Sequence, residues 1–483
     1  MMRHVLPLHD LSRMEVTLFI IHEQQRYQIQ QVENQHILGE VHIKMLGRGP
    51  HVTQFWDATE SVEAADHVNA AGICILFDLI GYTSDHRQDV LALRPAPIQV
   101  HYHGYMGTTG APWIQGYVAD RWIAPPEHAP YFSEKLMQMP ECFLGPSHRM
   151  THQFWGTGGS HDAEAGYGDG EVGRVGRGVA DGEEGAVEED AEYGGGNGGE
   201  GSDGAFDALA SRREKHGLPP HGPLLCFFNQ HFKIDPQTFS VWARASLTVD
   251  RVRRDLHAMR NPSAFDTPFY NTTIWMLRGS PVSQRNLRRE MEAAGLAREQ
   301  LVFAPRIKVK KHLRRASLCD IAVDTHEYNS GATAADTLFS GVPVVHLPGN
   351  KAVGRMLSAM LSAVRLPELI VRDFSEYQTL LEKLLLVTHG RHSQPFDAAP
   401  QSLWRGGGSI GGGGETSLGT GLDDGRKLRT LSEKLRRGIL WAPLFDVAKW
   451  VSDFEQLSRM TWDVHLSHGD VMHVIPCRPL NVF

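Results

Sequence analysis

Short apolar runs recur along this chain and alternate with stretches of helical periodicity, a pattern that strongly limits the possible folds. Continuous apolar runs of this length are typical of strands buried on both faces of a parallel sheet. We predict strands over 15–21, 73–77, 97–102, 224–228, 273–277, 301–303, 321–323 and 342–346, and helices over 283–294 and 332–339. The sequence therefore predicts an α/β protein with two Rossmann-like lobes facing a cleft, where ligands lie at the carboxyl ends of the strands.

Two stretches of unusual composition divide the chain. Residues 156–210 are Gly-rich and acidic, with almost no large apolar side chains, so they bury too little surface to offset chain entropy. A second Gly-rich stretch covers 405–425. We predict a first lobe over 1–150, a disordered linker over 151–214, a second lobe over 215–400, a flexible insert over 401–425 and a helical tail over 426–483.

Bulk composition narrows the class of protein. The net charge of −8 gives no general attraction to nucleic acid or to anionic membranes. The five cysteines stand singly, which argues against a disulfide framework and fits a reducing compartment. The first residues lack the apolar core of a signal peptide, and no run approaches 18 apolar residues. We expect a soluble cytoplasmic or nuclear protein without nucleic-acid or membrane partners.

The turn after the predicted strand 321–323 is the first candidate site. Small and turn-forming residues follow the strand, and a helix begins near Thr333. Free backbone N–H groups at a helix start attract anions, and Asp336, one turn further on, can accept bonds from ribose hydroxyls. The alternative is an ordinary helix start, capped by the side chain of Ser330 or Thr333.

Three further segments carry candidate groups. Gln230 and Lys233 follow the predicted strand 224–228, and Lys233 is placed to neutralise a leaving diphosphate or is simply solvated. In the basic run 306–315 most side chains are expected in solvent, whereas the ring of His312 can pack on a flat base. The turn over 104–111 contains Gly104, Gly107 and Thr108, and its glycines permit close backbone approach to a ligand.

Four possible metal ligands lie near the C-terminus of the chain. They are His465, His468, His473 and Cys477. Because their spacing fits no standard zinc motif, we expect no metal and no other cofactor.

Several long segments together carry a family resemblance. In the same order, they resemble the catalytic region of the protein O-GlcNAc transferases: DLIGYTSDHRQDVLALRPAPIQVHYHGYMGTTGAPWIQGYVAD, YFSEKLMQMP, FFNQHFKIDP, HLRRASLCDIAVDTHEYNSGATAADTLFSGVPVVHLPG and LRRGILWAPLFDVAKWVSDFEQ. The resemblance implies an inverting, metal-independent glycosyltransferase of the two-Rossmann-lobe (GT-B) type. Such an enzyme moves GlcNAc from UDP-GlcNAc to Ser/Thr hydroxyls of nuclear and cytosolic proteins.

The resemblance also implies roles for individual residues. Gln230 and the catalytic Lys233 match the residues that contact the diphosphate, and His312 matches the histidine that stacks on uracil. Thr333 matches a phosphate-binding threonine, and Asp336 matches the ribose-binding aspartate. The loop beside the sugar is matched by the turn that holds Gly104, Gly107 and Thr108.

The chain departs from the family pattern at several positions. Val309 occupies the position of a ribose-contacting lysine, Phe232 that of a tyrosine, and Cys74 that of an active-site histidine. Ser330-Gly331-Ala332-Thr333 occupies the position of the family's Gly-His-Thr-Thr. The opening segment, with a second active-site histidine, has no counterpart upstream of Met1. We therefore expect UDP binding with slow transfer. A protein O-fucosyltransferase that uses GDP-fucose and a non-catalytic UDP-binding scaffold remain alternatives.

Overall fold

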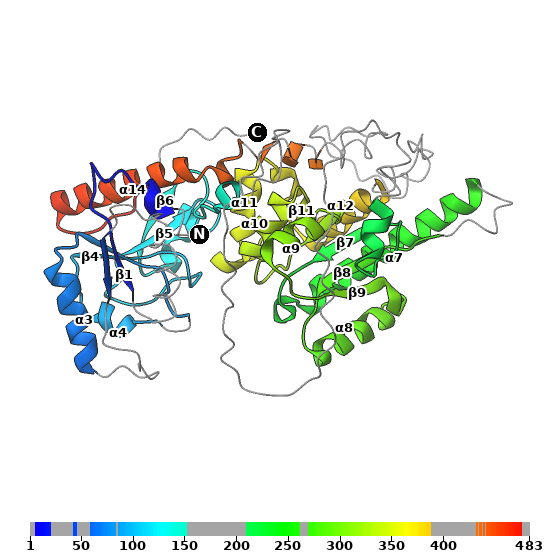
Figure 1. The fold of residues 1–483 in the computed structure, drawn as a ribbon, viewed down its shortest axis with the longest axis horizontal. Coiled ribbons are helices and arrows are strands. Elements are labelled where there is room, and N and C mark those ends of the chain that lie inside the picture. The colour runs from blue at the N-terminus through cyan, green and yellow to red at the C-terminus, as the bar shows by residue number, and fades with distance from the viewer. Residues whose placement is uncertain are drawn as a thin grey trace, which may run out of the picture.

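A computed structural model describes residues 5–20, 42–45, 58–83, 86–151, 209–260, 269–387 and 431–475 except 433, 437 and 440. The predictions for the insert over 401–425 and for most of the linker over 151–214 lie outside these ranges. Two α/β lobes lie side by side, the first in blue and cyan and the second in green and yellow (Figure 1). No helix within the described ranges is long and apolar enough to cross a membrane.

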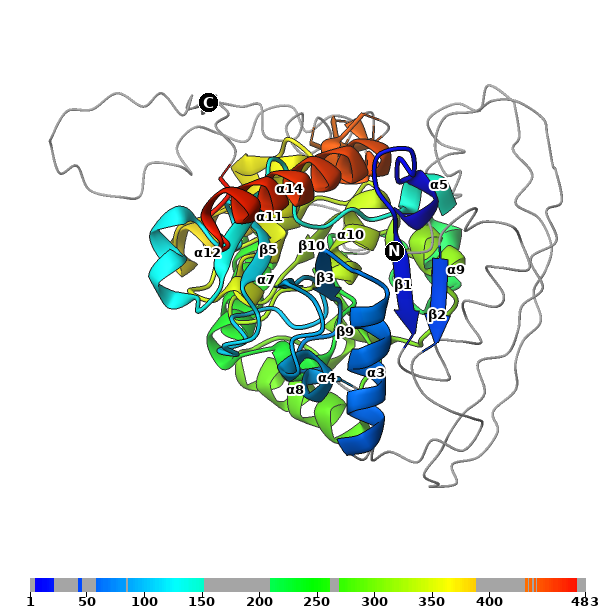
Figure 2. The ribbon, with the colours of Figure 1, turned by 90° about the vertical axis from the view of Figure 1, so that its left-hand side faces the viewer.

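The first lobe is built on a four-stranded parallel sheet in the order β3-β4-β5-β6. Its strands are β3 (Ile75–Asp78), β4 (Ile98–His101), β5 (Gly116–Asp120) and β6 (Lys135–Met139), and its helices are α3 (Ala58–Ala70), α4 (Gln88–Ala92) and α5 (His148–Thr151). A separate parallel pair joins β1 (Thr17–Ile20) to β2 (His42–Met45), as Figure 2 shows. The predicted strands at 15–21, 73–77 and 97–102 are confirmed, whereas the apolar pattern does not predict β2, β5 and β6.

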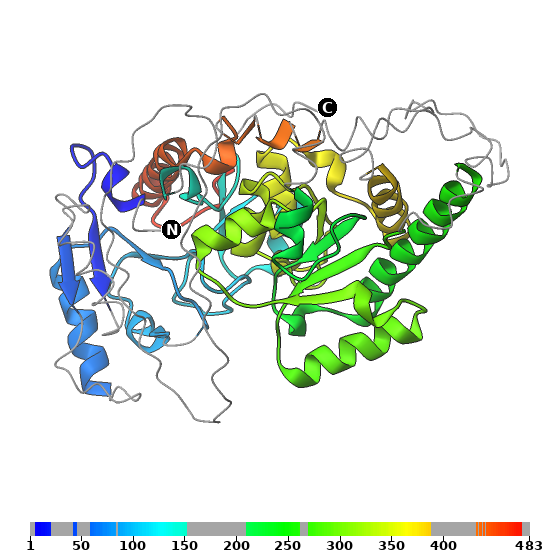
Figure 3. The ribbon, with the colours of Figure 1, turned by 45° about the vertical axis from the view of Figure 1, so that its right-hand side comes forward.

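The second lobe carries a five-stranded parallel sheet in the order β11-β10-β7-β8-β9. Figure 3 turns this lobe, drawn in green and yellow, toward the viewer. The strands are β7 (Leu224–Phe227), β8 (Thr273–Leu277), β9 (Leu301–Ala304), β10 (Ile321–Val323) and β11 (Val344–Val345), so all five predicted strands of this lobe are confirmed. The order reverses between β7 and β10. The loops that follow these two strands therefore separate at a topological switch point, which is where ligands bind in open α/β sheets.

Helices cover this second sheet, and two of them match the predicted ranges. They are α7 (Pro236–Arg260), α8 (Pro281–Ala293), α9 (Val309–Ala316), α10 (Ala332–Phe339), α11 (Met356–Ala363) and α12 (Phe374–Val387). Helix α8 begins where its sequence dictates: Pro281 fixes the first helical φ, and the Ser280 hydroxyl accepts the Ser283 N–H. Short 3-10 turns connect the elements, among them η3 (His231–Lys233), η4 (Arg298–Gln300) and η9 (Pro443–Phe445).

The C-terminal helix α14 (Val447–His468) returns to the first lobe (Figures 1 and 2). Its indole at Trp450 stacks on Tyr102 and Phe454, and the indole N–H donates to the Phe143 carbonyl at 3.2 Å. A Cβ at Gly145 would lie 2.7 Å from the same indole, so only glycine fits there. Buried side chains from both lobes and α14 form one continuous hydrophobic cluster.

The second lobe begins earlier than the predicted boundary at 215. Residues 209–214 are helical, and Arg213 is buried within the lobe. The Arg213 Nη2 lies 3.0 Å from Asp320 Oδ2, and both side chains are only 2% exposed. Asp320 also accepts the Leu224 N–H at the start of β7. The last residues assigned to the linker therefore belong to the lobe, because an arginine in a polar stretch is fixed by a carboxylate 107 residues away.

The cysteine pattern argues against a disulfide framework, but two of the five cysteines form a disulfide. Cys226, in β7, forms a disulfide with Cys319, two residues ahead of β10. Both sulfurs are buried in the core of the second lobe, whereas Cys74 and Cys142 are free. The spacing of 93 residues gives no sign of the pairing, which arises because β7 and β10 are neighbours in the sheet.

Breaking this disulfide is expected to destabilise the second lobe. Replacing Cys226 and Cys319 with alanine should lower the free energy of unfolding by about 2–4 kcal/mol, since the bond closes a long loop in the unfolded chain. Urea unfolding with and without dithiothreitol measures the loss, and the double variant should not respond to the reductant. Free thiol at all five cysteines of the denatured, unreduced chain would contradict the pairing.

Candidate functional site

The switch point of the second sheet brings together the loops after β7 and β10. Lys233, in η3, donates from Nζ to the Asn329 carbonyl at 2.8 Å. The same Nζ lies 4.0 Å from the centre of the Tyr328 ring. Both partners belong to the loop that leads into α10. The adjacency of the two loops thus depends on strand order, which the sequence does not reveal.

Lys233 is a half-buried cation. Burial lowers its pKa, opposed by the charge of Asp324. Asp324 does not pair with it directly: its Oδ1 accepts both the N–H and the hydroxyl of Ser330. Within the described residues, the Lys233 ammonium therefore has a carbonyl and a ring as partners but no carboxylate. Such a group retains positive charge for an incoming anion.

Helix α10 begins at Ala332, and the residue before it is a glycine whose backbone conformation excludes most other residues. Gly331 has φ 51° and ψ −122°, a conformation that side-chain-bearing residues rarely adopt. No side chain caps this helix, since the Ser330 hydroxyl is held by Asp324, and so the alternative of a Ser or Thr cap is wrong. Thr333 lies half-buried in the first turn, and its own N–H already donates to the Ser330 carbonyl at 3.2 Å.

His312, in α9, presents a neutral imidazole next to this turn. Its Nδ1 accepts from Arg315 Nε at 3.1 Å, which places the ring proton on Nε2. Phe228 contacts the ring edge-to-face at 5.1 Å. Burial, reinforced by Arg315 and opposed by Asp336, lowers the pKa of His312 to about 4. An uncharged, fixed ring suits packing against a flat base, while Val309 stands exposed in the first turn of α9.

Asp336 meets a residue of the other lobe that the sequence does not single out. His148, in α5, has its Nε2 2.6 Å from Asp336 Oδ1. Nearby, Arg355 Nε donates to the Trp122 carbonyl at 2.6 Å, a second contact between the lobes. His148 and Asp336 are 188 positions apart, and no motif in the sequence signals the pair. In the structure, the residue expected to bind ribose therefore contacts a histidine of the first lobe.

In the first lobe, the loop after β4 interlocks with the turn after β3. A Cβ at Gly104, whose φ is +40°, would lie 2.5 Å from the Ile80 carbonyl oxygen, so this glycine permits contact between two protein loops. Gly107 has ordinary space around it. The Thr108 hydroxyl donates to Glu134 Oε2 at 2.8 Å. Gly104, Gly107 and Thr108 thus lie on one loop, and Thr108 is fixed by a buried carboxylate.

Most of the remaining sequence candidates lie apart from Lys233, whereas Gln230 directly precedes the turn that contains it. Gln230 is exposed and sets the start of η3. Cys74 is exposed ahead of β3, at the amino end of the strand. In the C-terminal segment His465 stacks on Trp462, and His473 Nδ1 accepts the Leu136 N–H. Among the described residues, no three His, Cys, Asp or Glu side chains gather as metal ligands; Cys477 lies outside them.

His148 is expected to orient Asp336. His148→Ala should weaken UDP binding about 3- to 10-fold. The reason is that the Asp336 carboxylate loses the hydrogen bond to its Oδ1, which is worth about 1 kcal/mol and fixes its orientation. His148→Asn, which retains a donor, should recover part of the affinity. Calorimetric titration with UDP measures both changes. Tighter binding by His148→Ala would mean instead that His148 competes with the ligand.

Two α/β lobes, each built on a parallel sheet, with polar groups gathered at a switch point, are typical of the GT-B class of glycosyltransferases. The chain belongs to glycosyl transferase family 41, whose model matches residues 40–157 and 196–388.

Curated relatives support this membership. The chain is similar to the probable UDP-N-acetylglucosamine–peptide N-acetylglucosaminyltransferase SEC of Arabidopsis thaliana, with 25% identity over 417 residues that cover 86% of this chain and 32% of the relative. It is also similar to the UDP-N-acetylglucosamine–peptide N-acetylglucosaminyltransferase of Caenorhabditis elegans, with 24% identity covering 80% of this chain and 36% of the relative. The chain thus spans about a third of the length of these relatives.

A solved structure confirms the fold. A point mutant of the O-GlcNAc transferase of Thermobaculum terrenum superposes with a TM-score of 0.61 at 19% identity, covering 97% of this chain and 65% of that one. A glycosyltransferase from Rickettsia africae superposes with a TM-score of 0.50 at 7% identity, covering 96% of this chain and 94% of that one. The predicted two-lobe GT-B architecture is therefore confirmed.

Proposed function

We propose that this chain transfers GlcNAc from UDP-GlcNAc to Ser/Thr hydroxyls of cytosolic or nuclear proteins, with inversion at the sugar and without a metal or other cofactor. The observation that carries the proposal is Lys233, a half-buried cation without a carboxylate partner in the described chain, at the switch point of the second sheet. Family membership and the names of the relatives support the donor and the acceptor class.

The proposed donor site assigns one part of the nucleotide to each group. His312 stacks on uracil, Asp336 accepts from the ribose hydroxyls, and Gln230, Lys233 and Thr333 face the diphosphate. The sugar lies against the first-lobe loop of Gly104, Gly107 and Thr108. The proposal is supported by the positions of η3, which follows β7, and of α10, which follows β10, the two strands at the switch point.

In the proposed reaction, an acceptor hydroxyl attacks the anomeric carbon from the face opposite UDP. The new C–O bond forms as the bond to the β-phosphate oxygen breaks, UDP leaves, and the hydroxyl proton passes to solvent water. Negative charge develops on the leaving diphosphate, where the Lys233 ammonium is already in place. A preorganised cation of this kind supplies the electrostatic stabilisation that a metal ion supplies in other transferases.

Calorimetry and a transfer assay test the proposal together. We expect the chain to bind UDP and UDP-GlcNAc more tightly than GDP-fucose, and to incorporate sugar slowly into a Ser/Thr-rich peptide in the presence of EDTA. Loss of incorporation with EDTA, or preference for GDP-fucose, would reject the donor and metal assignments. Binding of UDP with no incorporation above a Lys233→Ala blank would leave a nucleotide-binding protein without transferase activity.

A further inference from the structure

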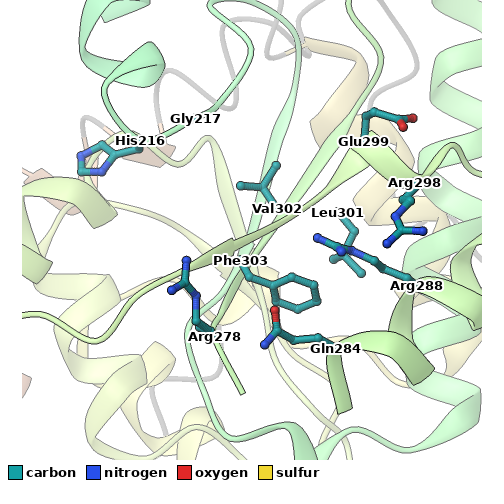
Figure 4. A pocket seen from close by; sticks show the side chains of 10 residues that line it. All are labelled: His216, Gly217, Arg278, Gln284, Arg288, Arg298, Glu299, Leu301, Val302 and Phe303. Atoms are coloured by element: carbon teal, nitrogen blue, oxygen red, sulfur yellow. The ribbon is translucent and has the colours of Figure 1, made fainter. Parts of the chain in front are cut away.

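A cavity of about 710 Å³ lies at the free edge of the second sheet, beside β9, the last strand in the order. It does not contain Lys233, His312 or Asp336. Three arginines line it: Arg278, directly after β8; Arg288, on α8; and Arg298, at the start of η4. Figure 4 shows Phe303 between Arg278 on one side and Arg288 and Arg298 on the other, with Gln284 nearby.

The three guanidinium groups have no acceptor among the described residues of the protein. Within the described ranges, none of them forms an ion pair or donates a side-chain hydrogen bond, although all three lie in one concavity. Arg288 packs with its Cζ 5.3 Å from the centre of the Phe303 ring, and its Nε is buried without a hydrogen-bond partner. A buried N–H of this kind lacks the acceptor that a bound ligand can supply.

The part of the lining formed by His216 lies near further positive charge. His216 lines the cavity, and its pKa is lowered by burial and further by the charges of Arg315 and Arg212. The one carboxylate in the lining is that of Glu299, which is exposed and does not bridge to any of the three arginines. Three arginines against one carboxylate therefore leave an excess of positive charge on one concave surface.

We propose that this cavity binds a small molecule bearing phosphate groups, at a site separate from that of Lys233. Each guanidinium presents a planar fork of N–H donors that matches the oxygens of a phosphate group, and three forks together suit a compact, multiply charged anion. The volume is in the usual range for small-molecule sites. An extended acidic peptide would spread its charge along the surface instead of concentrating it in one hollow.

The two sites are close neighbours. His231, in the same turn as Lys233, has its Nε2 2.7 Å from the Leu277 carbonyl and its ring 5.8 Å from that of Phe303. A phosphate probe can therefore enter either site, and the experiment has to separate them. The inference itself does not depend on the proposed transfer reaction, because it rests on the arginine cavity alone.

Inorganic pyrophosphate is the probe, titrated calorimetrically at fixed ionic strength into the full chain carrying Lys233→Ala, which weakens the first site. We expect pyrophosphate to bind this chain, and Arg278→Gln and Arg288→Gln each to weaken binding at least tenfold. Arg289→Gln is the matched control: Arg289 is the next residue on α8, 72% exposed and paired with Glu290, and its loss should change nothing. Glu299→Gln should strengthen binding two- to threefold, since it removes the negative charge.

Three outcomes would overturn the proposal. They are absence of pyrophosphate binding to the Lys233→Ala chain, equal affinities for the Arg278→Gln and Arg289→Gln variants, and tighter binding of a polyglutamate peptide than of pyrophosphate. If Arg288→Gln unfolds the protein, as followed by circular dichroism, Arg278→Gln and Arg298→Gln decide the question. Both side chains are exposed, so neither change disturbs the core.

Discussion

Lys233→Ala is expected to weaken UDP binding by about 10- to 100-fold, because a charge-assisted contact to phosphate contributes about 1.5–3 kcal/mol. Sugar transfer should fall further, by about 10²- to 10³-fold, since charge on the diphosphate grows as the bond to the sugar breaks. The structure adds a reason for the size of the effect. Lys233 is already half-buried and held by the Asn329 carbonyl, so little reorganisation is needed when the anion arrives.

Two further variants accompany this one: the first tests the role of the charge at position 233, and the second is a control elsewhere in the chain. Lys233→Arg retains the charge and should keep part of the UDP affinity, whereas Lys383→Ala, at an exposed position on α12, should bind UDP like the unchanged chain. Affinity and transfer are measured by calorimetry and by incorporation into a Ser/Thr-rich peptide. If Lys233→Ala bound UDP as tightly as Lys383→Ala does, the diphosphate would lie elsewhere.

Arg213→Ala is expected to lower the free energy of unfolding by about 3–5 kcal/mol, the usual loss when one member of a buried ion pair is removed. The substitution leaves the carboxylate of Asp320 in the core without its guanidinium partner. It also removes the bond from Arg213 Nη1 to the Gly222 carbonyl, just ahead of β7. Urea unfolding followed by circular dichroism gives the loss.

A double variant tests whether the buried charge is the cause. Arg213→Met with Asp320→Asn removes both charges, so it should be more stable than Arg213→Ala. A neighbouring basic residue, Lys215, is exposed, and Lys215→Ala should be neutral. Equal stabilities of the Arg213→Ala and Lys215→Ala variants would show that residues 209–214 are not anchored to the lobe.

The sequence predicts strands where apolar residues are continuous, and it fails where they are not. β7 reads Leu-Leu-Cys-Phe and β8 reads Thr-Ile-Trp-Met-Leu, and both are predicted. β6 reads Lys-Leu-Met-Gln-Met, residues with weak strand preference. It forms a strand because β5 pairs with it along its whole length and α14 packs against it. Tertiary contacts override the local preference there.

For the candidate site, the residue types are readable from the sequence but most of their partners are not. Lys233, His312 and Asp336 are identified by motif, and each motif follows a strand or begins a helix in a way that local pattern reveals. Their partners Asn329, Arg315 and His148 differ in this respect. Arg315 lies one turn from His312 on the same helix, whereas Asn329 and His148 are reached only through the fold.

The sequence by itself thus determined the family, the α/β class, all five strands of the second lobe and the side chains suited to a nucleotide-sugar. Those properties are local, because periodicity and motif chemistry act over a few residues. Strand order, the Cys226–Cys319 disulfide, the buried pair of Arg213 with Asp320, the contact of His148 with Asp336 and the arginine cavity were decided only by the tertiary structure. Each joins positions far apart in the chain, and only the packing of the sheets and helices brings them together.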